Sequence, residues 1–250
     1  MDEQAQPQIK DALLSLEKFL ESGVHIGSKF RNGEMKRFIY KTRPDGLSVL
    51  DVSVINERVR VAARFLSRYE PSDILVVAGR TYAQKPAQKL AEMIGAKCIA
   101  GRFTPGTLTN PGSDFFVEPK IALIADPPID RQAIKESVTA RVPVIALCNT
   151  GNTTADIDYI IPANNNGKKS LALVYYLLAR EILKNRGTIK SDEEFTTPMD
   201  DFETKTIHEE REFGFKEDRE RGRERGEGGR GFERGGGHGR ERGFQRRRTA

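Results

Sequence analysis

A cluster of basic and aromatic residues between positions 24 and 43 holds the side chains best suited to binding chemistry. The segment contains six cations and only one acid, Glu34; the cations are Lys29, Arg31, Lys36, Arg37, Lys41 and Arg43. Phe30, Phe38 and Tyr40 are interleaved with them. Lysine and arginine bind phosphate oxygens, and aromatic rings can stack on unpaired bases. The segment is therefore predicted to contact RNA. The alternative is a solvated loop whose aromatic residues close the edge of the core, and for Phe38 and Ile39 we favour packing.

A glycine-rich segment, Gly101–Gly112, is the second candidate site. It reads Gly-Arg-Phe-Thr-Pro-Gly-Thr-Leu-Thr-Asn-Pro-Gly and follows a short predicted strand, Lys97–Ala100. In open α/β sheets, ligands bind beside the carboxyl ends of the strands. The segment could therefore offer backbone N–H groups to a phosphate, with Arg102 as the counter-charge. A purely structural crossover loop explains the same residues equally well.

The third candidate is the segment Asn164–Ser170, which leads into a predicted helix and resembles half of a phosphate-binding loop. The Walker motif needs a glycine five residues before its Gly-Lys pair, but position 162 is proline, and a second lysine replaces the hydroxyl residue after the pair. An NTPase is therefore excluded. Lys168, Lys169 and the start of the helix could still hold a backbone phosphate.

The sequence contains no pattern typical of a catalytic or metal site. His25, His208 and His238 are the only histidines, and His25, which lies between two apolar residues, is interpreted as a core residue. Cys98 and Cys148 lie far apart beside apolar runs, which predicts buried free thiols rather than a disulfide or a zinc site. We therefore expect no enzyme activity, no metal and no cofactor.

Positive charge is concentrated at the C-terminal end. Residues 2–210 contain 28 Lys or Arg and 28 Asp or Glu, whereas residues 211–250 contain 13 and 8. The net charge of +5 thus belongs to a tail of Arg, Glu and Gly repeats. Such a segment buries too little apolar area to offset its ordering entropy, so we expect disorder, with RNA and protein both open as partners. No apolar run approaches the roughly 20 residues that span a bilayer, and no signal peptide is apparent. We expect a soluble, intracellular protein without a membrane partner.

Strands alternating with helices are predicted over most of the chain. Continuous apolar runs, typical of strands buried on both faces of a parallel sheet, are Leu47–Val52, Ile74–Ala78, Ile121–Ala125, Val144–Leu147 and, more weakly, Tyr159–Pro162. Helical periodicity predicts helices over residues 9–21, 55–69, 83–94, 129–140 and 170–183, with Ser53 capping the second and Gly95 ending the third. Residues 22–44 lack periodicity and predict an irregular loop. The βαβ order predicts an α/β domain with a doubly wound parallel sheet over residues 1–187, an acidic linker over 188–210 and the tail over 211–250.

Several of these motifs resemble one known family. Gly23-Val24-His25-Ile26-Gly27, followed by Met35–Tyr40, is similar to the N-terminal signature of the universal small-subunit ribosomal protein S2 family. Further stretches agree in the family's order: Arg102 to Asn110, Ala122–Asp126 with Ile129–Lys135, and Pro143–Leu147 leading to Asp158–Asn164. The resemblance covers roughly residues 11–186. Bacterial members insert a helical hairpin after the Leu-Thr-Asn motif. Here the next strand follows shortly after Asn110, which resembles the archaeal and eukaryotic form.

The resemblance implies a flavodoxin-like three-layer sandwich with a parallel central sheet. It also implies a structural role in the small ribosomal subunit in translation, in the cytoplasm, with small-subunit rRNA and neighbouring ribosomal proteins as partners. By position, the segment from Lys29 to Arg43 and the residues around Arg102 would face the rRNA. The alternative from another class is an α/β enzyme that binds a phosphorylated ligand at the strand ends. The absence of a positioned base, nucleophile or metal set argues against it.

Overall fold

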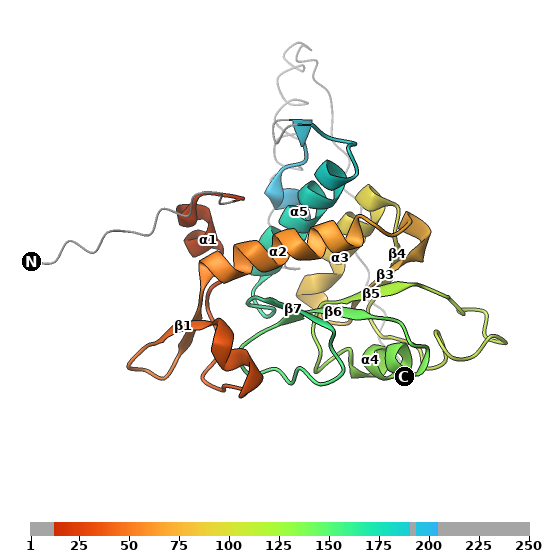
Figure 1. The fold of residues 1–250 in the computed structure, drawn as a ribbon, viewed down its shortest axis with the longest axis horizontal. Coiled ribbons are helices and arrows are strands. Elements are labelled where there is room, and N and C mark those ends of the chain that lie inside the picture. The colour runs from red at the N-terminus through yellow and green to blue at the C-terminus, as the bar shows by residue number, and fades with distance from the viewer. Residues whose placement is uncertain (1–12, 191–193, 205–250) are drawn as a thin grey trace, which may run out of the picture. The chain divides into compact units, whose positions relative to one another are not determined.

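The computed structural model describes residues 13–190 and 194–204, and a five-stranded parallel sheet forms the centre of this part (Figure 1). The strand order is β4-β3-β5-β6-β7. The strands are β3 (Ile74–Ala78), β4 (Lys97–Ala100), β5 (Ile121–Ile124), β6 (Val144–Cys148) and β7 (Tyr159–Pro162). Every residue of β3, β5 and β6 is buried, as their unbroken apolar sequences predict. When the five strands of this sheet are numbered along the chain, their order is 2-1-3-4-5, which is the order of flavodoxin-like folds. The predicted flavodoxin-like α/β fold is therefore confirmed.

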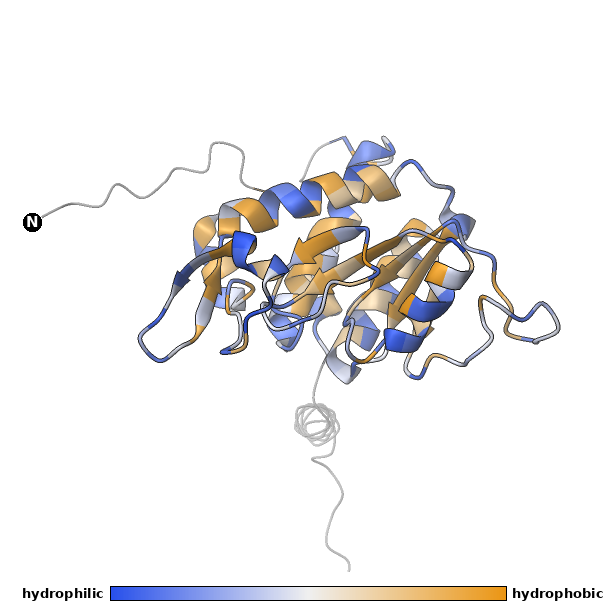
Figure 2. Cartoon of the chain, turned by 60° about the horizontal axis from the view of Figure 1, so that its bottom comes forward, coloured by the Kyte–Doolittle hydropathy of each residue, from blue (hydrophilic) through white to orange (hydrophobic). Residues whose placement is uncertain are grey.

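Helices cover both faces of the sheet, but unequally. Three long helices pack together on one face: α2 (Val52–Leu66), α3 (Thr81–Ile94) and α5 (Lys168–Asn185). The opposite face carries α4 (Arg131–Thr139) and irregular segments (Figure 1). Apolar residues are concentrated in the sheet and on the inward sides of the helices (Figure 2).

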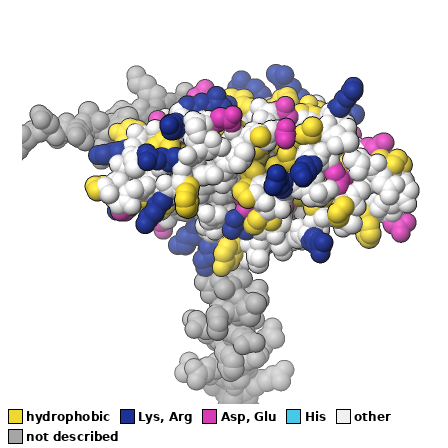
Figure 3. Space-filling view, turned by 90° about the horizontal axis from the view of Figure 1, so that it is seen from below, with side chains coloured by type: hydrophobic (Ala, Val, Ile, Leu, Met, Phe, Trp, Pro, Cys, Tyr) yellow, Lys and Arg dark blue, Asp and Glu magenta, His cyan; other side chains and the backbone are white. Residues whose placement is uncertain are grey.

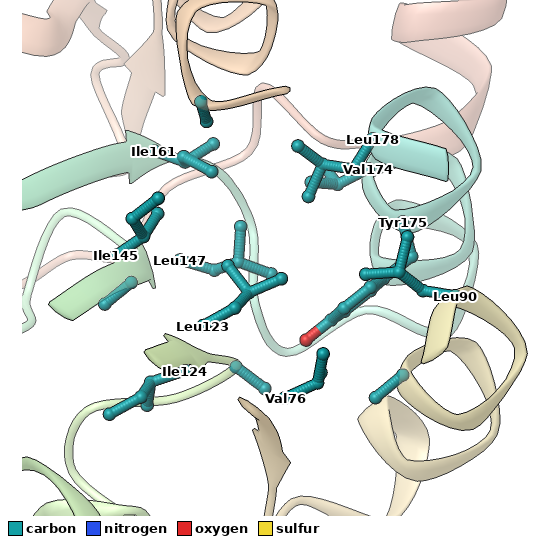
Figure 4. Packing of buried hydrophobic residues seen from close by; sticks show 14 of the residues in the cluster. Val76, Leu90, Leu123, Ile124, Ile145, Leu147, Ile161, Val174, Tyr175 and Leu178 are labelled. Atoms are coloured by element: carbon teal, nitrogen blue, oxygen red, sulfur yellow. The ribbon is translucent and has the colours of Figure 1, made fainter. Parts of the chain in front are cut away.

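The core includes buried side chains of α5 and of the sheet strands. Val174 and Leu178 point toward Leu147 and Ile161, and the Tyr175 ring reaches down toward the sheet (Figure 4). All five side chains are at most 1% exposed. Burial of α5 on nearly all sides explains why its sequence is more uniformly apolar than that of a surface helix.

Two helix ends test the predicted caps. Gly95 ends α3 in the left-handed conformation, with φ at 75°, as predicted. The prediction of Ser53 as the cap of α2 is wrong, because Asp51 occupies the cap position and its carboxylate accepts a hydrogen bond from the Ser53 N–H at 2.8 Å. Asp51 is the better cap here because its backbone is extended, which aims the side chain at the first turn.

The region before α2 differs from the prediction. The expected loop at 22–44 contains a 3₁₀ helix, η1 (Glu34–Phe38), and a strand, β1 (Ile39–Thr42); the helix before it is α1 (Leu16–Ser22). The strand expected at 47–52 is β2 (Ser48–Leu50), which pairs antiparallel with β1 in a separate two-stranded sheet. Only a few residues connect β1 to β2, with Gly46 at φ 82°. So short a connection permits an antiparallel pair but not a parallel one.

A C-terminal strap, residues 194–204, packs on α3 and α5 within the region expected to be an acidic linker. The strap contains a short helix, η4 (Met199–Phe202). A separate short helix, η2 (Pro71–Asp73), lies outside the strap, directly before β3. The Tyr176 ring meets those of Phe195 and Phe202 edge to face, with centroid distances of 5.1 and 5.9 Å. These aromatic residues attach the strap to the domain. The expected tail, residues 211–250, lies outside the described residues. Within the described ranges, no helix has the length and apolar character needed to cross a bilayer.

Candidate nucleic-acid interface

The basic segment, residues 27–43, presents all six predicted cations to solvent. Lys29 and Arg31 precede η1; the other four, Lys36, Arg37, Lys41 and Arg43, lie on η1, β1 and the hairpin turn, and all six are exposed. Seen from below, Lys and Arg side chains gather at the end of the domain where the hairpin and η1 lie (Figure 3). The one ion pair recorded in the segment is weak: Arg43 Nε lies 3.7 Å from Asp45 Oδ2, and both side chains are more than half exposed.

Buried side chains anchor the basic segment to the domain. Met35 and Phe38 are 0% and 2% exposed, which confirms that Phe38 packs, while Ile39 is half-buried. The Asp51 N–H donates to the Phe38 carbonyl at 3.0 Å, which connects the segment to the start of α2. The Arg58 guanidinium covers the Phe38 ring at 5.2 Å and the Tyr159 ring at 5.1 Å. Arg58 therefore supports the segment from behind, a role that the sequence pattern did not indicate.

A polar clamp fixes the start of the segment against the loop after β6. The Ser28 N–H donates to Thr150 Oγ1 at 2.8 Å, and the Asn32 N–H donates to the Thr150 carbonyl at 2.8 Å. The Asn32 amide also donates to the Asn152 carbonyl at 3.0 Å. A methyl group at Gly27 would lie 2.6 Å from Thr150 Cγ2 and 2.7 Å from the Ser48 carbonyl oxygen, so only glycine fits. The clamp therefore fixes the backbone on either side of Lys29 and Arg31, while their side chains are exposed to solvent.

Charged groups of the protein itself fill the carboxyl ends of β3 and β5, where this fold class usually binds ligands. Arg80 Nε donates to Asp126 Oδ2 at 2.9 Å, and Asn165 Nδ2 donates to Asp126 Oδ1 at 3.0 Å. Burial raises the pKa of Asp126 despite the opposing effect of Arg80. Burial likewise raises the pKa of Asp130 to about 6. The Gly79 N–H donates to Asp130 at 2.9 Å.

A cavity of about 460 Å³ lies beside this network, lined by Gly79, Gly101, Arg102, Phe103, Pro105, Ile129, Asp130 and Gln132. A phosphorylated ligand in this cavity would face the Asp130 carboxylate and would find the Gly79 N–H already bonded. The cavity is therefore poorly suited to an anion, although Arg102 lines it.

The glycine-rich segment binds an internal anion. The Gly106 and Leu108 N–H groups donate to the two Glu136 carboxylate oxygens at 2.8 and 3.1 Å, and Gln132 Nε2 donates to Glu136 at 2.8 Å. Although burial opposes ionisation, these hydrogen bonds lower the pKa of Glu136. The N–H groups that were candidates for a phosphate thus hold a carboxylate, which favours the interpretation of a structural crossover loop. Arg102 itself is exposed.

The remaining predicted site residues lie at the start of α5. Lys168 Nζ lies 3.5 Å from the Glu203 carboxylate of the strap, whereas Lys169 is exposed. Arg102 follows β4, and the clamp on the basic segment follows β6, three strand positions away in the sheet. At about 4.8 Å per strand, that separation is on the order of 14 Å. The sheet therefore does not bring Arg102 directly beside the basic segment.

Burial shifts the pKa of the other candidate reactive groups toward their uncharged forms. His25 is half-buried, and burial lowers its pKa although a hydrogen bond with the Phe19 backbone acts in the opposite direction. Both cysteines are free, and burial raises the pKa of Cys98 to about 11 and that of Cys148 to about 12. In the part of the chain that the structure describes, no three His, Cys, Asp or Glu side chains group as metal ligands would.

Comparison with known proteins identifies relatives along most of the chain. The family described as Ribosomal protein S2 matches residues 19–115 and 113–185. The small ribosomal subunit protein uS2 of Thermoplasma acidophilum is 52% identical over 194 residues, which is 78% of this chain and 98% of that protein. The uS2 protein of Methanococcus maripaludis is 47% identical over 80% of this chain and 89% of its own length. That of Staphylothermus marinus is 50% identical over 81% of this chain and 91% of its own length.

Proposed function

The chain belongs to the ribosomal protein S2 family, and on this premise we propose that its basic segment binds phosphates of the small-subunit rRNA. Family membership gives the chain a structural role in the small ribosomal subunit. The observation that carries the proposal is that six exposed cations lie on one short segment that is clamped to a packed domain.

The clamp matters because RNA binding must offset the loss of freedom of the side chains that bind. Cations on a fixed backbone lose less entropy on binding than cations on a mobile loop. Each phosphate that a cation neutralises also releases a counterion, which makes the affinity depend on salt. Six such contacts would lower the affinity by several decades between low and moderate salt.

Residues outside the basic segment contribute less in this proposal. Arg102 and Lys169 are exposed and available to a phosphate. Lys168 would contact RNA only by exchanging Glu203 for a phosphate. The Arg-rich tail adds weak, sequence-tolerant contacts with RNA or with neighbouring ribosomal proteins. Such a protein would reside on ribosomes in the cytoplasm.

Membership in a family of structural ribosomal proteins also implies that the chain is not an enzyme. The rival function, an enzyme for a phosphorylated ligand, is disfavoured on chemical grounds. The Asp130 carboxylate lines the strand-end cavity, and Glu136 occupies the N–H groups of the glycine-rich segment. Both features repel the phosphate that such an enzyme would have to bind.

The test compares two full-length variants of equal net charge. The first replaces the six basic-segment cations with glutamine. The control replaces six exposed cations elsewhere: Arg64, Lys97, Arg131, Lys135, Arg141 and Lys190. Sedimentation of cell extracts measures incorporation into small subunits, and RNase treatment identifies RNA-dependent association. The first variant should be lost from the subunit and the control retained.

Titration with small-subunit rRNA gives a second measure. For the first variant, the slope of log affinity against log salt should become less steep by about 4 to 5 units. Equal incorporation and equal slopes for both variants would refute the proposal.

A further inference from the structure

We infer that Phe30 and Tyr40 are stacking sites for unpaired RNA bases, so that the basic segment recognises single-stranded or bulged RNA rather than a regular duplex. This inference rests on the proposed function and names the class of RNA that the same segment binds. The two side chains are 81% and 75% exposed, which makes them the most exposed large hydrophobic residues among those described.

The Phe30 ring projects from a backbone that the clamp holds rigid. The Phe30 carbonyl accepts a hydrogen bond from Ser28 Oγ at 2.9 Å, and Thr150 Oγ1 lies 3.1 Å from the same oxygen. On the other side, a methyl group at Gly151 would lie 3.1 Å from Phe30 Cβ, so the two backbones are in close contact. Phe30 is thus fixed up to its Cβ while its ring remains free. Binding a base would then order only the side-chain torsions.

Tyr40 is exposed for a different structural reason. In the β1–β2 pairing, Ile39 faces Leu50 and Lys41 faces Val49, so two steps along β1 correspond to one step along β2. Tyr40 is the extra residue of this bulge. A bulge leaves its extra residue outside the regular ladder and redirects its side chain. The Tyr40 ring is 75% exposed at this bulge, whereas the preceding Ile39 is half-buried.

The charges around both rings favour RNA as the occupant. Lys29 and Arg31 flank Phe30 in the chain, Lys41 follows Tyr40, and all three are exposed. An uncharged protein surface that covered the rings would bury these cations without partners, at a large cost. A single RNA strand instead offers base faces for the rings and phosphates for the cations. A regular duplex offers phosphates and 2′-hydroxyls but no free base faces, because its bases are already stacked and paired.

The test uses the full-length protein and two fluorescently labelled RNAs, an oligouridine and a blunt RNA duplex of the same length. Phe30→Leu and Tyr40→Leu keep an apolar side chain but remove the flat ring. Each should weaken oligouridine binding roughly 5- to 100-fold and leave duplex affinity unchanged. Tyr40→Phe, which keeps the ring, should bind like the wild type. Phe115→Leu is the matched control, because Phe115 is 67% exposed but lies outside the basic segment.

The outcomes separate this inference from the proposed function. Equal losses on both RNAs, or no loss on oligouridine, would overturn the stacking role while RNA binding by the cations stands. A leucine variant that binds both RNAs normally but fails to enter the small subunit would assign the rings to a protein neighbour, which also overturns it. If the six-glutamine variant binds both RNAs like the wild type, the proposed function itself fails.

Discussion

Replacing Glu136 with glutamine is expected to destabilise the domain, because the carboxylate is the internal anion that organises the glycine-rich segment. Its two oxygens accept hydrogen bonds from the Gly106 and Leu108 N–H groups at 2.8 and 3.1 Å. Glutamine has nearly the same shape, but an amide NH₂ group replaces one of the two carboxylate oxygens. That NH₂ group is a donor, and it would face the Gly106 or the Leu108 N–H, which is also a donor. One charge-assisted bond is lost and one buried N–H is left unpaired, which we expect to cost about 1–3 kcal/mol in the free energy of unfolding.

The pH dependence gives this prediction a distinctive sign. Hydrogen bonds lower the pKa of Glu136 below its ordinary value of 4.5 although burial opposes them. A lowered folded-state pKa stabilises the fold above the unfolded-state pKa, and that stability is lost as the pH falls through the folded-state pKa. The difference between wild type and Glu136→Gln should therefore be full at neutral pH and shrink as the pH falls below 4.5.

Urea denaturation of the full-length protein measures this difference, with the midpoint and the slope determined separately. Hydrogen exchange of the Gly106 and Leu108 amides should report the same loss locally. Glu118→Gln is the control, because Glu118 is an exposed carboxylate shortly before β5. The reasoning would be refuted by a Glu136→Gln protein as stable as the wild type at neutral pH, or by a difference that persists unchanged in acid.

Three further predictions concern other parts of the domain. Gly27→Ala should destabilise the fold by about 1–3 kcal/mol in denaturation, because the added methyl group would lie 2.7 Å from the Ser48 carbonyl oxygen. Gly33→Ala is the control and should be nearly neutral, because the space around Gly33 is open. Equal effects of the two substitutions would contradict this reasoning. Phe202→Ala removes a ring that is 0% exposed, so it should release the C-terminal strap and speed limited proteolysis there, and unchanged cleavage would argue against a docked strap. The Asp130 carboxyl should titrate near pH 6 by NMR. Between pH 3.8 and about 6 the folded state then binds more protons than the unfolded chain, so the free energy of unfolding falls as the pH rises through that window. A titration midpoint at pH 3.8 would contradict the buried position of this carboxyl.

The elements of the central sheet were predictable because their signals are local. The unbroken apolar runs of β3, β5 and β6 can be buried only between two layers, and the helical periodicity of α2 and α3 matches the faces that they bury. The β1–β2 hairpin was missed because β1 is only four residues long and half exposed, so it shows no clear alternation. The strap was missed because its acidic residues obscured the two buried phenylalanines.

For the candidate site, the sequence alone determined which side chains could meet a phosphate: Lys and Arg repeat along the basic segment with one intervening acid, and residues of this type stay at the surface. Only the tertiary structure decided how these cations are held and which other candidates are already occupied. Ser28 meets Thr150 across 122 positions of sequence, and Glu136 reaches back 30 positions to Gly106. Spacing along the chain carries information about neighbours on one helix or strand. Partners so far apart are brought together by the packing of the sheet and its loops, which a local pattern does not encode.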